Sequence, residues 1–210
     1  MAKVKIALTK MRCLDETSEP SASDEPYVLV FAAKLQKVGG LVTIPSAHTV
    51  MYGPWSNVDE GDLVTTNRIQ FGPPLKILPP ANFWGISGSA EELSNQDDAI
   101  FIAAVMENDD AQAGGIRAGT HAQMFAAITS YANAGMSRST MVSKLKKDMR
   151  DILTGVTVTG IPSSDDLVNI TEVRFASDAL QKVSTAIQVK TIELSGDGGK
   201  YRLRFEMSKG

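Results

Sequence analysis

The chain has 210 residues, of which 43% are hydrophobic and 21% are charged, a composition typical of ordinary globular proteins. Its formal net charge of −3 argues against general electrostatic binding to nucleic acid. The one cysteine, Cys13, excludes an internal disulfide framework and a cysteine-based zinc or iron–sulfur centre. The two histidines, His48 and His121, leave little for a histidine-built metal centre.

The N-terminal segment does not have the pattern of a secretory signal. Lysines at positions 3, 5 and 10 interrupt every apolar step, and no small-residue cleavage site follows. No stretch approaches the roughly 18–20 consecutive apolar residues of a membrane-spanning helix. We therefore expect a soluble protein made in the cytoplasm, without a cleavable signal peptide or a transmembrane span. Export by a non-classical route stays compatible with this pattern.

Alternation of apolar and polar residues dominates the first half of the chain and predicts β-strands. The alternation is clear in residues 3–9, and the denser apolar run at 27–33 is typical of a central strand. Residues 99–106 form the most apolar run in the chain, and acidic residues at both ends indicate a buried strand with solvated ends. Strands are also expected over residues 42–52 and 63–71.

Four prolines fall within residues 72–88, which predicts a largely extended connection. Two large aromatic residues near its end, Phe83 and Trp84, are expected to anchor this connection to the core.

Two helices are predicted in the middle of the chain. Thr120 and Gln123 have the spacing of a capping box, which places the start of the first helix at Thr120, and Gly135 is a C-terminal stop. The second helix is expected from Ser137 to Gly155. Its apolar face contains Met141, Val142, Leu145, Met149 and Ile152, and its cations are Lys144, Lys146, Lys147 and Arg150.

The β pattern resumes after Pro162. Strands are expected over residues 167–175, 186–194 and 201–207, and the run Gly-Asp-Gly-Gly at 196–199 is typical of a hairpin turn.

The sum is seven to nine strands in a mainly β, antiparallel β-sandwich with an inserted α-helical hairpin. We expect a single domain over residues 1–210, in which 1–110 and 163–210 form the sandwich and 111–162 form the helical insertion. The alternative is an α+β domain with the hairpin packed across an open sheet.

Acidic residues gather in three segments that border strands: 15–25, 107–110 and 163–166. In a sandwich of strands that run up and down, these segments emerge at the same end. Converging carboxylates repel each other unless a cation or a basic partner lies between them, and hard oxygen ligands suit Ca²⁺. Two alternatives stay open: loop acids that are simply solvated, and a carboxylate pair in acid–base catalysis.

Several short motifs resemble those of C2 domains. Residues 23–28 (SDEPYV) resemble the S-D-P-Y-V signature with one residue inserted, and residues 105–110 (VMENDD) resemble the V-x-D-x-D strand exit. Residues 164–168 (SDDLV) resemble the later D-D-x-I-G element, and Asn82-Phe83-Trp84 stands where C2 domains often have N-P-x-W. The matches occur in order along most of the chain outside residues 111–162.

The resemblance implies an eight-stranded, C2-like sandwich with calcium-binding loops at one end, which often dock on anionic membranes. By position, it implies five metal ligands: Asp15, Asp24, Glu107, Asp109 and Asp166.

No catalytic motif is present; Gly85-Ile86-Ser87-Gly88-Ser89, for example, is not G-x-S-x-G. We therefore expect a non-enzymatic C2-like module that binds a membrane surface or a protein partner through its acidic loops, with Ca²⁺ as a cofactor. One alternative is a secreted toxin or effector of the insecticidal or pore-forming type, which would use the amphipathic hairpin at a membrane. Another is a structural subunit of a larger assembly, such as a homo-oligomer.

Overall fold

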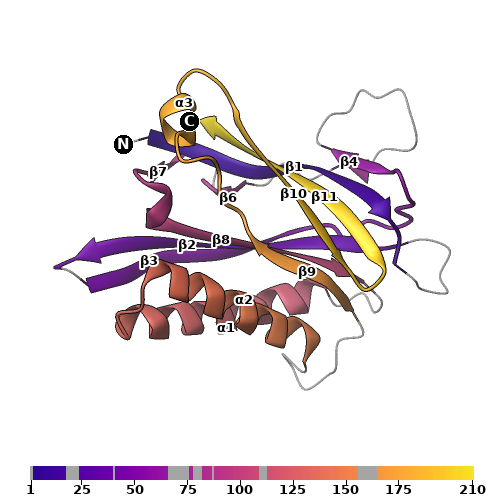
Figure 1. Ribbon diagram of the computed structural model, residues 1–210, viewed down its shortest axis with the longest axis horizontal. Coiled ribbons are helices and arrows are strands. Elements are labelled where there is room, and N and C mark those ends of the chain that lie inside the picture. Colours follow the sequence, from indigo (N-terminus) through magenta and orange to yellow (C-terminus); the bar gives the residue numbers. More distant parts are fainter. Residues whose placement is uncertain are drawn as a thin grey trace.

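The protein is mainly β, with two sheets and, in the part of the chain described, three α-helices (Figure 1). The computed structural model describes residues 2–17, 24–39, 41–65, 76–77, 82–86, 88–108, 113–155 and 165–210. All strand pairings within these residues are antiparallel except that of β4 with β5.

The first sheet is built around β1, which pairs with four other strands along its length. The strand order is β10-β11-β1-β4-β5, and β6 and β7 also pair with β1. Its strands are β1 (Ala2–Asp15), β4 (Leu63–Thr65), β5 (Lys76–Ile77), β6 (Asn82–Trp84), β7 (Glu91–Leu93), β10 (Gln188–Gly196) and β11 (Gly199–Lys209).

The second sheet has the order β3-β2-β8-β9 and lies face to face with the first (Figure 1). Its strands are β2 (Pro26–Val38), β3 (Leu41–Tyr52), β8 (Ala99–Glu107) and β9 (Asp166–Glu172). A short 3₁₀-helix, η1 (Gln96–Asp98), leads into β8, every residue of which is buried. The buried strand expected at residues 99–106 is therefore confirmed.

One hydrophobic core fills the space between the sheets. The predicted alternation in β1 places Val4, Ile6 and Leu8 in this core. Phe83 and Trp84 each contact the ring of Phe101 edge to face, with centroids 5.3 Å apart. The expected anchoring of the proline-rich connection by these two aromatic residues is thus confirmed.

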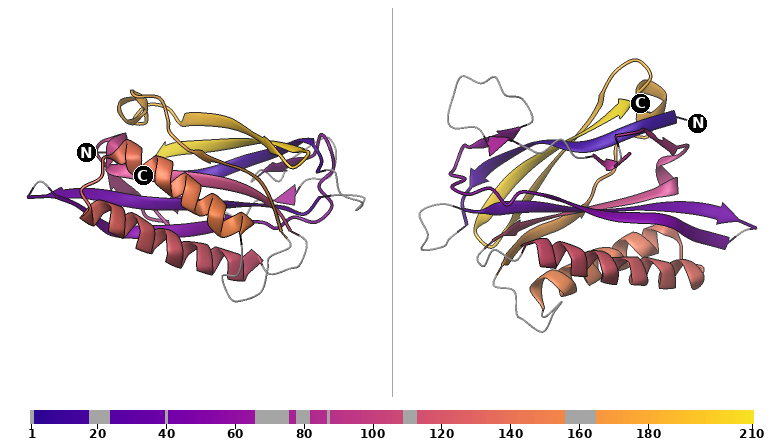
Figure 2. Two further views of the ribbon diagram at one scale, coloured as in Figure 1. Left: turned by 60° about the horizontal axis from the view of Figure 1, so that its bottom comes forward. Right: turned by 180° about the vertical axis from the view of Figure 1, so that it is seen from behind.

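A second core lies between the second sheet and two helices, α1 (Ala113–Asn133) and α2 (Arg138–Thr154), which cover the outer face of that sheet (Figure 2). The strands β2 and β8 are buried on both faces: Val28 of β2 faces the first core and Leu29 faces the second. This double burial explains why both strands are continuous apolar runs rather than alternating ones. No helix in the described part of the chain is long and apolar enough to cross a membrane.

The expected start of the first helix at Thr120 is wrong. The helix begins at Ala113, and Thr120 is a fully buried residue inside it. Thr120 has the four-residue spacing of Ile116 and Met124, which also face the core. Burial of this face stabilises a glycine-rich first turn that looks like a helix breaker in the sequence. By contrast, Ser137 caps α2 as expected, accepting a hydrogen bond from the main-chain N–H of Thr140.

The strands also differ from the expected set. The described residues contain eleven strands. Strands β5, β6 and β7 have only two or three residues each, which is too short for an alternating pattern to reveal them. Within the expected strand 63–71, β4 ends at Thr65 and the remainder lies outside the described residues. A third helix, α3 (Ala179–Lys182), was not expected between β9 and β10. The hairpin turn at 196–199 is confirmed, with Asp197 and Gly198 both at positive φ.

Candidate functional site

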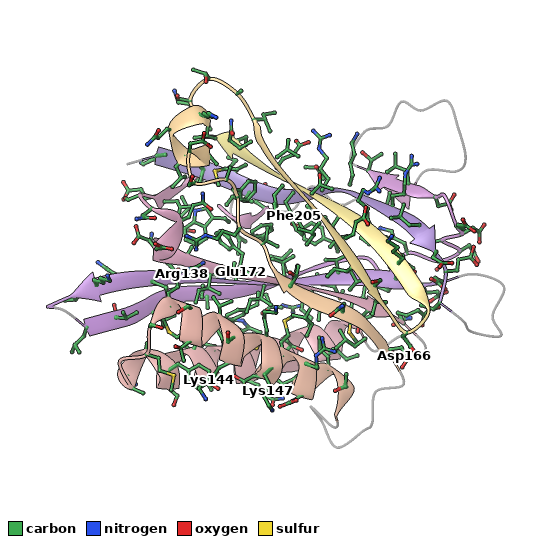
Figure 3. All side chains as sticks on the ribbon, in the orientation of Figure 1. Arg138, Lys144, Lys147, Asp166, Glu172 and Phe205 are labelled. Atoms are coloured by element: carbon green, nitrogen blue, oxygen red, sulfur yellow. The ribbon has the colours of Figure 1, made fainter. Side chains whose placement is uncertain are left out.

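The three acidic segments meet at one end of the second sheet, as far as they are described. In the strand register, Glu107 of β8 lies between Pro26 of β2 and Asp166 of β9. Figure 3 shows Asp166 at the end of β9, beside the β10–β11 hairpin. Asp109 lies outside the described residues, so its predicted place at this end stays a prediction.

Glu107 and Glu25 are joined through main-chain and side-chain groups. The main-chain N–H of Glu25 donates to Glu107 Oε1 at 2.8 Å. In return, Asn108 donates its main-chain N–H to the Glu25 carbonyl at 3.2 Å and its Nδ2 to the Glu25 carboxylate at 3.2 Å. Glu107 is only 3% exposed. Because it accepts the bond from Glu25, one of its oxygens is already used to align the start of β2 with the end of β8.

Asp24 is likewise a buried carboxylate, 2% exposed. It accepts hydrogen bonds from the main-chain N–H of Thr17 at 3.0 Å, from the Thr17 hydroxyl at 2.6 Å, and from the Tyr201 hydroxyl. A carboxylate that accepts three such bonds is satisfied without a metal ion. Asp24 therefore connects the loop before β2 to β11 of the first sheet.

The buried charge of Asp24 changes the acidity of its neighbours. Burial, and then the charge of Asp24, raise the pKa of the Cys13 thiol to about 12. Burial and the hydrogen bond to Asp24 raise the pKa of the Tyr201 hydroxyl above its ordinary value. Both groups are consequently neutral at physiological pH, so the hydroxyl of Tyr201 is an uncharged donor to Asp24 and the Cys13 thiol adds no second negative charge.

A further buried acid, Asp165, lies at the same end. Its Oδ2 accepts a hydrogen bond from the Tyr27 hydroxyl at 2.7 Å. Asp165 is 5% exposed, whereas the adjacent Asp166 is partly exposed. The sequence pattern identified the segment but not this division between a buried and an exposed acid.

Asp15 is the remaining proposed ligand. It is the last residue of β1 in the other sheet, where it is exposed and pairs in register with Lys200. Among the described residues, no group of three or more His, Cys, Asp or Glu side chains is placed to hold a metal ion. The register thus brings Asp24, Glu107 and Asp166 to one end, with two of the three carboxylates buried and bonded to protein donors.

Sequence reasoning missed a fourth acidic segment at this end. Asp59 and Glu60 are exposed on the loop before β4, and Val58 holds this loop beside Asp24 through two main-chain hydrogen bonds. The N–H of Glu60 also donates to the carboxylate of Glu16. The signal was present as the acidic run at 59–62, which lies outside the three acidic segments that border the expected strands. We call the exposed and partly exposed acids of this end the acidic rim: Asp15, Glu16, Glu25, Asp59, Glu60 and Asp166.

Comparisons with models of known protein families, with curated proteins and with solved structures yield no match to this chain.

Proposed function

We propose that the chain is a non-enzymatic, C2-like binding module whose acidic rim binds a basic surface of a protein partner. The observation that carries the proposal is the strand register, in which Glu107 lies between Pro26 and Asp166 and so gathers the acidic segments. Two facing sheets, with α1 and α2 between the neighbouring strands β8 and β9, support a C2-like sandwich with a helical insertion.

The division of the acids favours binding over catalysis. Asp24, Glu107 and Asp165 are buried and accept hydrogen bonds from protein donors, so they hold the loops in place. The acidic rim around them is exposed or partly exposed to solvent, where its negative charges steer a partner of opposite sign. A basic protein surface needs only this field, whereas Ca²⁺ needs six to eight oxygens at close range.

Calcium binding at Asp15, Asp24, Glu107, Asp109 and Asp166, followed by docking on an anionic membrane, is the second form of this proposal. The exposed Asp15 and the partly exposed Asp166 are the carboxylates best placed to turn toward an ion. The toxin alternative has less support, because the apolar face of the helical pair is buried against the second sheet. Insertion of the pair into a membrane would first require that this core open.

The test uses a lysine-rich peptide as the probe of a basic surface. We expect the labelled peptide to bind the full chain, and to bind more weakly as salt rises, because exposed charges are screened over about 10 Å at 0.1 M salt. A double variant, Asp59→Asn and Glu60→Gln, should weaken binding. The matched control neutralises acids outside the rim, Glu92→Gln and Asp178→Asn, and should leave it unchanged.

Equal binding by the rim variant and the control variant would overturn the proposal for a basic partner. A parallel calorimetric titration with Ca²⁺, with EDTA as control, tests the second form. Saturable heat that disappears in Asp166→Asn, together with Ca²⁺-dependent sedimentation on phosphatidylserine vesicles, would favour the membrane form instead.

A further inference from the structure

The two histidines of the chain line one cavity at the open edge of β3, far from the acidic rim. A cavity of about 250 Å³ there is lined by His48, Thr49 and Val50 of β3, Ile86 of the β6–β7 connection, and Arg117 and His121 of α1. Strand β3 is the edge of its sheet, and α1 packs alongside it (Figure 2). The two imidazoles, which can carry a positive charge, and the guanidinium of Arg117, which always does, therefore share one small cavity.

Two contacts fix the groups on the helix side. Arg117 Nη1 donates to the carbonyl of Thr49 at 3.4 Å, and His121 Nδ1 lies 3.3 Å from the Thr49 hydroxyl. Thr49 is buried, 6% exposed, so both contacts tie α1 to an ordered part of β3. The ring of His121 also stacks on Phe125, with centroids 6.2 Å apart, which limits its rotation.

Among the described residues that line the cavity, none has a carboxylate, although the chain as a whole has net charge −3. From α1 the cavity receives Arg117 and His121, and from β3 it receives His48. The β6–β7 connection contributes the uncharged Ile86, and the register partners of Thr49 and His48 on β2 are the uncharged Phe31 and Ala32. No ion pair involving Arg117 is found in the described part of the chain.

These neighbours act on the imidazole of His121. Burial, then the positive charges of His48 and Arg117, lower its pKa below the ordinary value of 6.5. Burial and these positive charges thus disfavour protonation of His121 in the cavity. An anion would remove that resistance and allow His121 to take up a proton, which is how histidine-containing anion sites become pH-dependent.

We propose that the cavity between β3 and α1 binds a small oxyanion, such as the phosphate group of a monoester, through Arg117, His48 and His121. Three donor groups from two elements suit the several oxygens of a phosphate better than the two oxygens of a carboxylate. The volume, about 250 Å³, is below the roughly 300–1,000 Å³ of a site for a drug-sized ligand. It admits the anion and a short apolar portion beside Val50 and Ile86.

Sulfate and inorganic phosphate are the probes, measured by isothermal titration calorimetry on the full chain. Sulfate does not titrate near neutral pH, so any change in its affinity with pH comes from the protein. We expect saturable binding at one site that strengthens about tenfold between about pH 7.5 and pH 5.5, with proton uptake by the protein. Proton uptake is read from the dependence of the heat on the ionisation enthalpy of the buffer.

Arg117→Gln should weaken sulfate binding about tenfold or more, because it removes a charged donor. His48→Gln is a second variant of the proposed site. Because His48 is an exposed residue of the edge strand, this substitution should not disturb the fold. Arg12→Gln, an exposed arginine on β1, is the matched control and should bind as the unmodified chain does.

The proposal would be overturned by the absence of saturable sulfate binding at millimolar concentrations, or by equal affinities in Arg117→Gln and Arg12→Gln. Binding that is independent of pH would remove His121 from the site. Glycerol phosphate and vesicles containing phosphatidic acid separate the two sources of the same chemistry. Binding of the first alone assigns a soluble ester, and sedimentation on the second that is lost in Arg117→Gln assigns a lipid headgroup.

Discussion

Tyr201 of β11 donates its hydroxyl to Asp24, which lies directly before β2, and this buried bond connects the two sheets at the acidic end. The same carboxylate accepts two bonds from Thr17, two residues after the end of β1. The acid that the sequence identified as a metal ligand is therefore a junction between three segments of the fold.

Removal of the Tyr201 hydroxyl should destabilise the protein. Tyr201→Phe leaves the buried Asp24 with one donor fewer, which costs roughly 1–3 kcal/mol in the free energy of unfolding. Urea denaturation followed by tryptophan fluorescence measures this loss. The matched control is Tyr131→Phe, which removes a hydroxyl bonded to Asp148 between α1 and α2 at a partly exposed position. The control should lose less, and equal losses would contradict the role given to Asp24.

Cys13 should be unreactive in the folded protein. It is fully buried, and its pKa of about 12 leaves on the order of one thiolate in ten thousand at about pH 8. Because Cys13 is the only cysteine, an absorbance assay with an aromatic disulfide reagent reports on this position alone. The reagent should react only when denaturant is added. A native reaction as fast as that of the unfolded chain would show that the thiol is accessible.

Local pattern predicted most strands and the second helix, because each depends on near neighbours in sequence. The alternation in β1, the cap at Ser137 and the turn at Asp197-Gly198 are examples. The start of α1 could not be predicted in this way. The segment before Thr120 is rich in glycine, and it forms a helix because Ile116 packs against the second sheet, a contact that no local pattern contains.

The candidate sites were predictable to different degrees. Alternating strand direction was enough to predict that Asp24, Glu107 and Asp166 lie at one end. It could not show that Asp24 is satisfied by Tyr201, since these residues are 177 positions apart. The cavity between His48 and His121 depends on how α1 lies along the edge of β3. In the sequence, the two histidines are isolated residues in unrelated segments.

The start of α2 is fastened to the second sheet by Arg138. Its guanidinium donates to the carbonyl of Ala99 at 2.8 Å and to Glu172 at 2.7 Å, and Figure 3 shows Arg138 and Glu172 side by side. Both side chains are largely shielded, with 17% and 23% exposed. Arg138→Met should therefore lower the free energy of unfolding by about 2 kcal/mol, since bonds to charged groups are worth roughly 1.5–3 kcal/mol.

The control for this variant is Lys147→Met, which breaks an ion pair with Asp151 on the outer side of α2. Lys147 is 73% exposed, and such surface pairs contribute little. Thermal melting of the two variants should separate them. A shift as large for Lys147→Met as for Arg138→Met would contradict the anchoring role of Arg138.

Two glycines should respond to alanine in opposite directions. Gly198 has a φ of +78° in the β10–β11 turn, so Gly198→Ala should cost about 1 kcal/mol. Gly114 is an exposed residue of α1 with open space around it, so Gly114→Ala should stabilise by about 0.5–1 kcal/mol. Melting temperatures that fall for the first and rise for the second are expected. The same sign for both would contradict the turn or the early helix start.

His121 should make stability depend on pH in a defined direction. Its pKa in the folded protein lies below the ordinary value of 6.5, through burial and the charges of His48 and Arg117. As pH falls below that ordinary value, the unfolded chain takes up the proton first, so the free energy of unfolding decreases. Above it, the imidazole is neutral in both states and contributes no slope.

The variant His121→Gln should remove this part of the slope, and the difference between variant and unmodified chain isolates His121 from all carboxylates that titrate in both. Urea denaturation in a buffer without sulfate or phosphate, between about pH 7.5 and pH 5.5, measures the difference. Addition of sulfate at the lower pH should restore stability to the unmodified chain more than to His121→Gln, because an anion in the cavity stabilises the protonated imidazole. An unchanged slope in His121→Gln would mean that the imidazole titrates alike in the folded and unfolded chains. The conclusion that the cavity disfavours a protonated His121 would then be wrong.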